Sequence, residues 1–167
     1  MQDTKSGKDP IPFVPIGTIY TPFTDITGMP VQPAGARGTR GSVEIFPEYA
    51  EGLMDIEGFS HLFLIYAFHP SPSYKLTVIP FLDTTPRGVF ATRAPRRPNP
   101  IGLSTVRLIE VSGTTLVVED GDILDGTPLL DLKPYVPAFD SYPNASSGWL
   151  EGSAGRAGSC RSDERFR

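Results

Sequence analysis

Hydrophobic residues in this chain gather in short stretches separated by turns rich in proline and glycine. Stretches rich in β-branched and aromatic residues predict strands at residues 15–23, 41–46, 60–68, 75–82, 102–124 and 129–136. The run 60–68 is continuously apolar, which is typical of a strand buried on both faces. The long run 102–124 is broken at Ser112 and Gly113 and predicts a hairpin. Pro80 indicates an edge strand or a bulge.

The pattern of elements favours an all-β dominated fold. Residues 47–58 begin with a proline, carry acids in the first turn and end in glycine, and therefore predict one short helix. Eighteen prolines and 17 glycines in 167 residues disfavour long helices, and this length suits one hydrophobic core. Six or seven strands without regular alternation with helices predict a small closed or partly open β-barrel with one short helix.

The two ends of the chain are polar. We expect residues 1–9 and the Ser/Gly-rich residues 141–167 to be flexible extensions of a domain at 10–140. The N-terminus lacks the apolar segment of a secretory signal, and the apolar run 62–68 is too short to cross a bilayer. These features predict a soluble, cytoplasmic protein with no membrane association. Cys160 is the only cysteine, so no disulfide can form within the chain.

The net charge of −4 conceals two segments of opposite sign. Residues 87–107 contain five arginines and no acid, whereas residues 119–140 contain six acids and one lysine. An acidic protein is a poor candidate for coating nucleic acid non-specifically, because that mode depends on a broad basic surface. A local basic segment leaves open a more specific contact.

The basic segment 88–104 reads GVFATRAPRRPNPIGLS. Its three prolines between residues 95 and 100 fix φ and stiffen the loop, so that little conformational entropy is lost on binding. The side chains suited to a carboxylate or phosphate are Arg93, Arg96, Arg97 and Asn99. The alternative is a solvated surface loop with structural ion pairs.

An acidic turn and a polar strand follow the hairpin. The turn consists of Asp125, Gly126, Thr127 and Pro128, a good sequence for a tight turn. Downstream, Asp131, Lys133 and Tyr135 alternate along a predicted strand and therefore share one face. An acid, a base and a phenol on one face are a candidate polar site, and an ordinary salt-bridged strand edge is the alternative.

Metal and phosphate-loop sites are not indicated. His61 and His69 would be about 26 Å apart on one strand, too far to share an ion. The glycine-rich residues 35–41 lack the strand and helix that flank a phosphate-binding loop. The residues alone name no cofactor.

Two long motifs carry a resemblance to a known family. The segments GVFATRAPRRPNPIGLS (88–104) and LDGTPLLDLKPYVPAFD (124–140), with GFSHLFLIYAF (58–68) upstream, resemble the TsaA-like family of β-barrel tRNA methyltransferases, also called TrmO. The likeness covers about residues 15–140. It implies a small β-barrel, usually a homodimer, that binds S-adenosylmethionine without a Rossmann domain. Family members methylate N6 of the threonylcarbamoyl-modified adenosine just 3′ of the tRNA anticodon.

The resemblance also implies the cofactor contacts. They lie at Pro30, Val31, Gln32, His61, Leu62, Arg93, Leu103, Asp125, Gly126, Thr127 and Pro128. The family usually has serine and histidine where this chain has Ala94 and Arg96, so a role of that histidine either passes to the arginine or is lost. Many bacterial members carry a further C-terminal domain, which we do not expect in this chain.

Roles in the reaction follow as hypotheses. We expect Arg93 to serve the cofactor, and Arg96, Arg97 and Asn99 to contact phosphates of the anticodon loop. The shared face suggests Asp131 or Tyr135 as the base or orienting group, with Lys133 holding the threonyl carboxylate or a phosphate. Two other functions stay open: a non-catalytic S-adenosylmethionine-binding module, and a methyltransferase that acts on another RNA or on a nucleotide.

Overall fold

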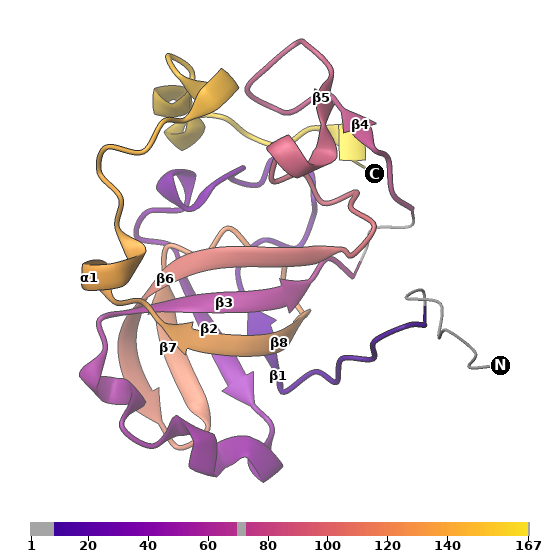
Figure 1. Cartoon of the computed structure of the whole chain (residues 1–167). Coiled ribbons are helices and arrows are strands. Elements are labelled where there is room, and N and C mark those ends of the chain that lie inside the picture. Colours follow the sequence, from indigo (N-terminus) through magenta and orange to yellow (C-terminus); the bar gives the residue numbers. More distant parts are fainter. Residues whose placement is uncertain (1–8, 70–72, 167) are drawn as a thin grey trace, which may run out of the picture.

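The chain folds into a six-stranded closed barrel with a second, smaller layer of structure over one end (Figure 1). The structure is a computed structural model, and it describes residues 9–69 and 73–166. The barrel strands are β1 (Gly17–Tyr20), β2 (Arg40–Ile45), β3 (His61–Ala67), β6 (Ile101–Ser112), β7 (Thr115–Glu119) and β8 (Thr127–Pro134). All neighbours are antiparallel in the order β1-β2-β7-β6-β3-β8, and β1 pairs with β8 to close the barrel. The predicted fold class is confirmed.

The remaining elements are short. They are the strands β4 (Thr77–Val78) and β5 (Arg87–Gly88), the helix α1 (Pro137–Asp140) and the 3₁₀ turns η1 (Pro33–Gly35), η2 (Pro47–Leu53), η3 (Ile56–Gly58), η4 (Val89–Ala91), η5 (Gly148–Leu150), η6 (Ala154–Gly158) and η7 (Glu164–Phe166). Within the described ranges, no helix combines the length and the apolar character that a bilayer crossing requires.

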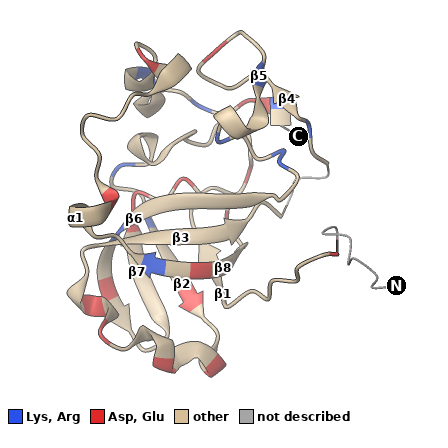
Figure 2. Cartoon of the chain, in the orientation of Figure 1, with Lys and Arg blue, Asp and Glu red and all other residues tan. Residues whose placement is uncertain are grey.

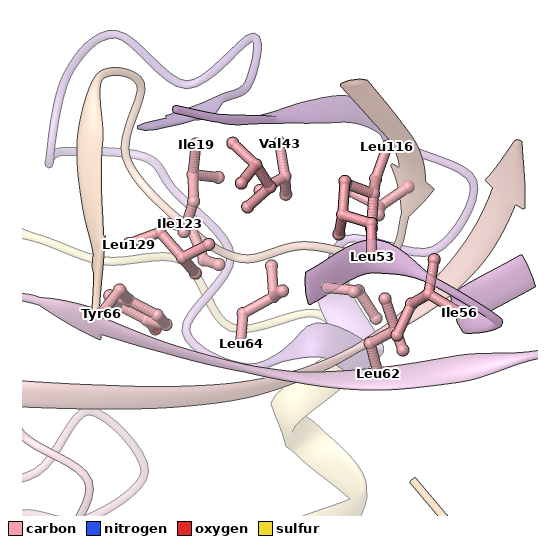
Figure 3. Close-up of a cluster of buried hydrophobic side chains, with 13 residues drawn as sticks. Ile19, Val43, Leu53, Ile56, Leu62, Leu64, Tyr66, Leu116, Ile123 and Leu129 are labelled. Carbon is pink, nitrogen blue, oxygen red and sulfur yellow. The ribbon is translucent and has the colours of Figure 1, made fainter. Parts of the chain in front are cut away.

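The barrel interior is filled by alternate residues of each strand. On β3, Leu62, Leu64 and Tyr66 point inward and are buried, whereas the residues between them are half-buried on the outer face (Figure 3). The expectation that residues 60–68 form a strand buried on both faces is therefore wrong. A closed barrel has a single interior, so only one face of each strand can reach it.

Residues 47–58 were expected to form a helix, and the structure instead has two 3₁₀ turns there, η2 and η3. Asp55 between them adopts a left-handed conformation with φ 65°, which breaks any continuous helix. Leu53 and Ile56 are buried in the same cluster as the barrel core (Figure 3). The apolar residues identified in the sequence thus close one end of the barrel without forming an α-helix.

The hairpin predicted within residues 102–124 is confirmed as β6 and β7. Glu119 at the end of β7 accepts from Arg40 Nε on β2 at 3.0 Å and forms a second ion pair with Arg107 on β6. Its bond to Arg40 is the main reason that the pKa of Glu119 lies below its usual range. The run 75–82 contributes only the two-residue strand β4, which pairs with β5 outside the barrel.

The C-terminal segment 141–166 packs against the domain. Trp149 Nε1 donates to the carbonyl of Ala91 at 2.7 Å, and Arg165 Nη1 donates to that of Pro80 at 3.0 Å. These contacts fasten the segment to the domain, and the prediction that it is a flexible extension stays a prediction. The corresponding prediction for residues 1–9 falls, apart from residue 9, outside the described residues. The segment itself lies over one end of the barrel (Figure 1).

Replacement of Leu64 tests the core. Leu64 has no exposed surface, so Leu64→Ala leaves a cavity that we expect to cost about 2–5 kcal/mol of unfolding free energy. The measurement is the denaturant midpoint followed by circular dichroism. Met54→Ala is the control, because Met54 is 72% exposed and its loss should change stability by less than about 0.5 kcal/mol. Equal midpoints for the two variants would contradict the barrel core.

Candidate functional site

A cavity of about 780 Å³ lies between the rim of the barrel and the segments that cover it. Its floor comes from the ends of β3, β6 and β8 and from the loop between β7 and β8. Its walls come from residues 29–32, 80–82 and 90–97 and from the C-terminal segment. The volume is within the range of small-molecule sites, which are mostly apolar with a few polar groups.

Tyr66 defines the floor of the cavity. It is the last inward-pointing residue of β3, and its ring lies against Gly102, the residue opposite it on β6. A Cβ atom at position 102 would overlap the ring of Tyr66, so only glycine allows this approach. Phe68 meets Tyr66 edge to face with ring centroids 5.5 Å apart. The sequence of β6 therefore fixes the position of the Tyr66 ring.

Tyr66 begins a chain of three polar groups. Its hydroxyl lies 3.0 Å from Ser104 Oγ, and Ser104 Oγ donates to Asp122 Oδ1 at 2.6 Å. Because the serine hydroxyl has one proton and gives it to Asp122, Tyr66 is the donor in the first bond. Ser104 is only 3% exposed, whereas Tyr66 and Asp122 line the cavity. The chain therefore connects the barrel interior with the cavity.

Burial shifts the acidity of both ends of this chain. It raises the pKa of Tyr66, and the charge of Asp122 raises it further, so the phenol stays protonated. Burial also raises the pKa of Asp122 above its usual value, while the bond from Ser104 and the charge of Arg93 act in the opposite direction. Asp122 is thus a carboxylate that holds a proton more readily than an exposed aspartate does.

The basic loop, residues 88–100 of the basic segment, forms one wall of the cavity. Arg93 Nη1 donates to Gln32 Oε1 at 3.0 Å and links this loop to the wall at residues 29–32. Arg97 Nη1 instead donates to the carbonyls of Val89 and Thr92, at 3.0 and 2.8 Å. The guanidinium of Arg97 thereby holds the η4 turn in place. Arg97 therefore stabilises the loop and also lines the cavity.

The cofactor contacts implied by the sequence divide into two groups. Those that line the cavity are Pro30, Val31, Gln32, Arg93, Leu103 and Thr127. Those outside the lining are His61, Leu62, Asp125, Gly126 and Pro128. Asp125 Oδ1 accepts from the amide of Thr21 at 3.0 Å, and Gly126 supplies a positive φ of 72°. The acidic turn therefore places Thr127 at the cavity while its other residues shape the backbone.

His61 and Leu62 lie at the end of β3 that is remote from Tyr66. Leu62 is fully buried in the core, and His61 stands edge-on to Tyr135 with ring centroids 6.2 Å apart. Neither residue lines the cavity, so their role as cofactor contacts stays a prediction. The sequence motif GFSHLFLIYAF thus reaches the cavity through its last residues, Tyr66 and Phe68.

The three residues selected for catalysis do share a face, but it is the outer face of the barrel. Lys133 Nζ forms an ion pair with Asp131 Oδ2 at 2.8 Å, and both side chains are exposed. Tyr135 packs edge to face against Phe63, with centroids 5.4 Å apart. None of Asp131, Lys133 and Tyr135 lines the cavity. The alternative of a salt-bridged strand edge describes this pair, and the geometry gives no support to a catalytic role.

Among the residues selected for RNA, Asn99 is exposed and Arg96 is half-buried. The sequence reasoning missed Ser104 and Asp122, and also the aromatic lining residues Phe81, Phe90, Trp149 and Phe166. Asp122 stands three residues before the acidic turn, which was the one available signal. In the described part of the chain, no cluster of three or more His, Cys, Asp or Glu residues could hold a metal ion.

Comparison with known proteins gives consistent matches. A probable S-adenosyl-L-methionine-binding protein of Pyrococcus abyssi is 52% identical over 152 residues, which cover 91% of this chain and 83% of the relative. The tRNA (adenine(37)-N6)-methyltransferase of Escherichia coli is 35% identical over 149 residues, which cover 83% of this chain and 63% of that enzyme. This chain therefore spans a little less than two thirds of the length of the E. coli enzyme.

A solved structure agrees with the sequence matches. The crystal structure of TrmO from Pseudomonas aeruginosa superposes with a TM-score of 0.71 at 38% identity, covering 84% of this chain and 63% of that chain. A family model described as the tRNA-methyltransferase O N-terminal domain matches residues 18–141. The match contains every barrel strand except the first residue of β1, so this chain belongs to the tRNA-methyltransferase O N-terminal domain family.

Proposed function

We propose that this chain is an S-adenosylmethionine-dependent tRNA methyltransferase that methylates N6 of the threonylcarbamoyl-modified adenosine next to the anticodon. The observation that carries the proposal is that the basic loop and the segment around Thr127 border one cavity of about 780 Å³. Relatives named as tRNA (adenine(37)-N6)-methyltransferases support the adenosine and its position. The archaeal relatives are named for cofactor binding alone.

The cavity has the groups that S-adenosylmethionine requires. Aromatic side chains from three segments, Phe81, Phe90 and Trp149, offer apolar faces for an adenine ring. Arg93, held by Gln32, offers a guanidinium for the carboxylate of the methionine part. Asp122 adds the negative charge that a cationic ligand favours. These residues therefore suit the adenine ring, the carboxylate and the positive charge of the cofactor.

When bound, the cofactor supplies a methyl group attached to a positively charged sulfur. The chain's own contribution is alignment and the exclusion of water, and proximity of this kind can lower a barrier by about 7–11 kcal/mol. The stiff proline-rich loop suits this task, because Arg97 fastens it to the η4 turn before any ligand arrives. The C-terminal segment, through Trp149 and Phe166, shields the side of the cavity away from the barrel.

The distribution of charge supports an approach of RNA at the cavity end. Acidic residues gather at the other end of the barrel, where η2 and η3 lie (Figure 2). Arg93 and Arg97 border the cavity, so an RNA backbone meets attraction at this end of the barrel and repulsion at the other. Asn99 is exposed on the same loop and is a candidate contact. An adenosine in a single-stranded loop can enter a pocket at low unstacking cost.

Two further expectations belong to this proposal. The family resemblance suggests a homodimer, and the chemistry on tRNA suggests a cytoplasmic protein. The outer face of β6 carries Leu103 and Ile101, which are 57% and 39% exposed. Such exposed apolar side chains favour a contact between two copies. A second copy could also complete the grip on the tRNA.

Methyl transfer to defined tRNA tests the function. The protein should transfer label from methyl-labelled S-adenosylmethionine to tRNA that carries the threonylcarbamoyl mark and leave unmarked tRNA unlabelled. Transfer regardless of the mark would indicate another RNA substrate. Cofactor binding without any transfer would indicate a binding module. The rate at low tRNA concentration should fall steeply with added salt, because phosphate contacts release counterions.

Replacement of Trp149 tests the shielding role of the C-terminal segment. Trp149→Ala removes an aromatic wall and its bond to Ala91, so we expect the dissociation constant for S-adenosylmethionine to rise about tenfold, or ~1.4 kcal/mol. Isothermal titration calorimetry measures this constant. Tyr142→Ala is the matched control, since Tyr142 lies in the same segment, is 75% exposed and is not in the lining. Equal affinities for the two variants would remove the segment from the cofactor site.

A further inference from the structure

The polar chain from Tyr66 through Ser104 to Asp122 is the least expected feature of the cavity. An inward-pointing serine is unusual in a barrel filled with leucine, valine and isoleucine, and its cost is relieved only by its two hydrogen bonds. The network is fully formed at 3.0 and 2.6 Å. Its outer end, Asp122, opens to the cavity. An apolar residue at position 104 would fill the barrel without the desolvation cost of a buried hydroxyl. The network therefore indicates a functional role.

Asp122 differs from the other acid in the cavity wall. Asp163 is engaged by the guanidinium of Arg165, whose Nε and Nη2 lie 2.8 and 2.6 Å from its carboxylate oxygens. That partner lowers the pKa of Asp163 and keeps it ionised. Asp122 has no ion pair among the described residues and accepts a bond from a neutral hydroxyl instead. Of the two carboxylates, Asp122 is therefore the one able to take up a proton.

We propose that Asp122 is the proton acceptor in the methyl transfer, and that Ser104 and Tyr66 are positioning residues that hold its carboxylate. This inference rests on the function proposed above and assigns the residue that accepts the proton in that reaction. The N6–carbon bond forms, the carbon–sulfur bond breaks with its electron pair going to sulfur, and the N6 proton goes to the Asp122 carboxylate. No other reactant is needed.

The surroundings of Asp122 suit this role. A ureido nitrogen is a weak nucleophile, so a base that removes its proton during attack contributes about 10²–10⁴ to the rate. Burial raises the pKa of Asp122, which makes the ionised form a stronger base. The groups that face it are Tyr66 from β3, Ser104 from β6 and Arg93 from the basic loop, and the charge of Arg93 lowers this pKa. The proton acceptor thus lies beside the residue assigned to the cofactor.

The first experiment compares Asp122→Asn with Asp120→Asn in single-turnover methyl transfer at saturating S-adenosylmethionine and marked tRNA. Asp122→Asn keeps the shape and the bond from Ser104 but removes the base, so we expect the rate to fall about 100-fold or more. Asp120 accepts from the amide of Gly38 at 2.7 Å and does not line the cavity. Its backbone is left-handed, a conformation that asparagine tolerates. Asp120→Asn should keep the rate within about threefold of the unmodified chain.

The dependence of this rate on pH separates a base from a structural acid. The rate of the unmodified chain should rise with pH through the pKa of Asp122 and then level off, and Asp122→Asn should lose that rise. Ser104→Ala removes a bond that lowers the pKa of Asp122. We therefore expect Ser104→Ala to keep the rise but move it to higher pH, which a purely structural change would not do.

Stability provides a readout that needs neither cofactor nor tRNA. Since the folded pKa of Asp122 is raised, the folded chain holds a proton that the unfolded chain has lost between the two pKa values. The free energy of unfolding therefore falls as pH rises through that window. In Asp122→Asn this contribution is absent. The variant should therefore gain stability relative to the unmodified chain as pH rises through that window, with a difference that levels off above it.

The outcomes separate the two proposals. An unmodified chain that binds S-adenosylmethionine but transfers no methyl group overturns the proposed function, and this inference with it. An active chain whose Asp122→Asn variant transfers at an unchanged saturating rate overturns the inference alone, including the case where only cofactor affinity falls. Parallel stability curves for Asp122→Asn and the unmodified chain would also overturn it, because Asp122 would then not be a buried acid.

Discussion

The closure of the barrel by the pairing of β1 with β8 is the constraint on which the rest of the structure depends. A closed sheet has one interior, and the period of two along each strand decides which residues enter it. The register of β3 against β6 sets Leu64 opposite Ser104 and Tyr66 opposite Gly102. A slip of β3 by one residue would turn Leu64 and Tyr66 to the outer face. The polar floor of the cavity is therefore a direct consequence of strand register.

The walls of the cavity come from segments that the barrel does not order. The loop at 29–32, the basic loop and the C-terminal segment are far apart in sequence and meet only over the rim (Figure 1). They are joined by side-chain bonds, such as Arg93 to Gln32 and Trp149 to Ala91, and by backbone bonds of Ser162 with Gly28 and Met29. The bridge between Pro30 and Arg161 ties two of these walls directly.

The fold could be predicted from the sequence further than the site could. Strand patterning and the many turns identified the barrel, because alternation is a local property of each strand. The sequence pattern gave a wrong prediction at residues 47–58. The left-handed conformation of Asp55 interrupts a helix there, and a single φ angle cannot be predicted from hydrophobic periodicity. The motif resemblance placed Arg93, Gln32 and Thr127 at the cavity, but alternation alone could not say whether Asp131 and Tyr135 face inward or outward. Trp149 reaches the site through tertiary packing that leaves no local pattern.

The cavity holds two groups of opposite charge that do not pair with each other. Asp122 and Arg93 both line it, yet they form no ion pair, because Asp122 Oδ1 is taken by Ser104 and Arg93 is turned to Gln32. A direct pair would lower the pKa of Asp122 and would neutralise both groups before a ligand arrived. Their separate neutral partners keep each available for a ligand that carries both signs of charge. A salt bridge between Asp122 and Arg93 would therefore leave neither charge free to bind a ligand.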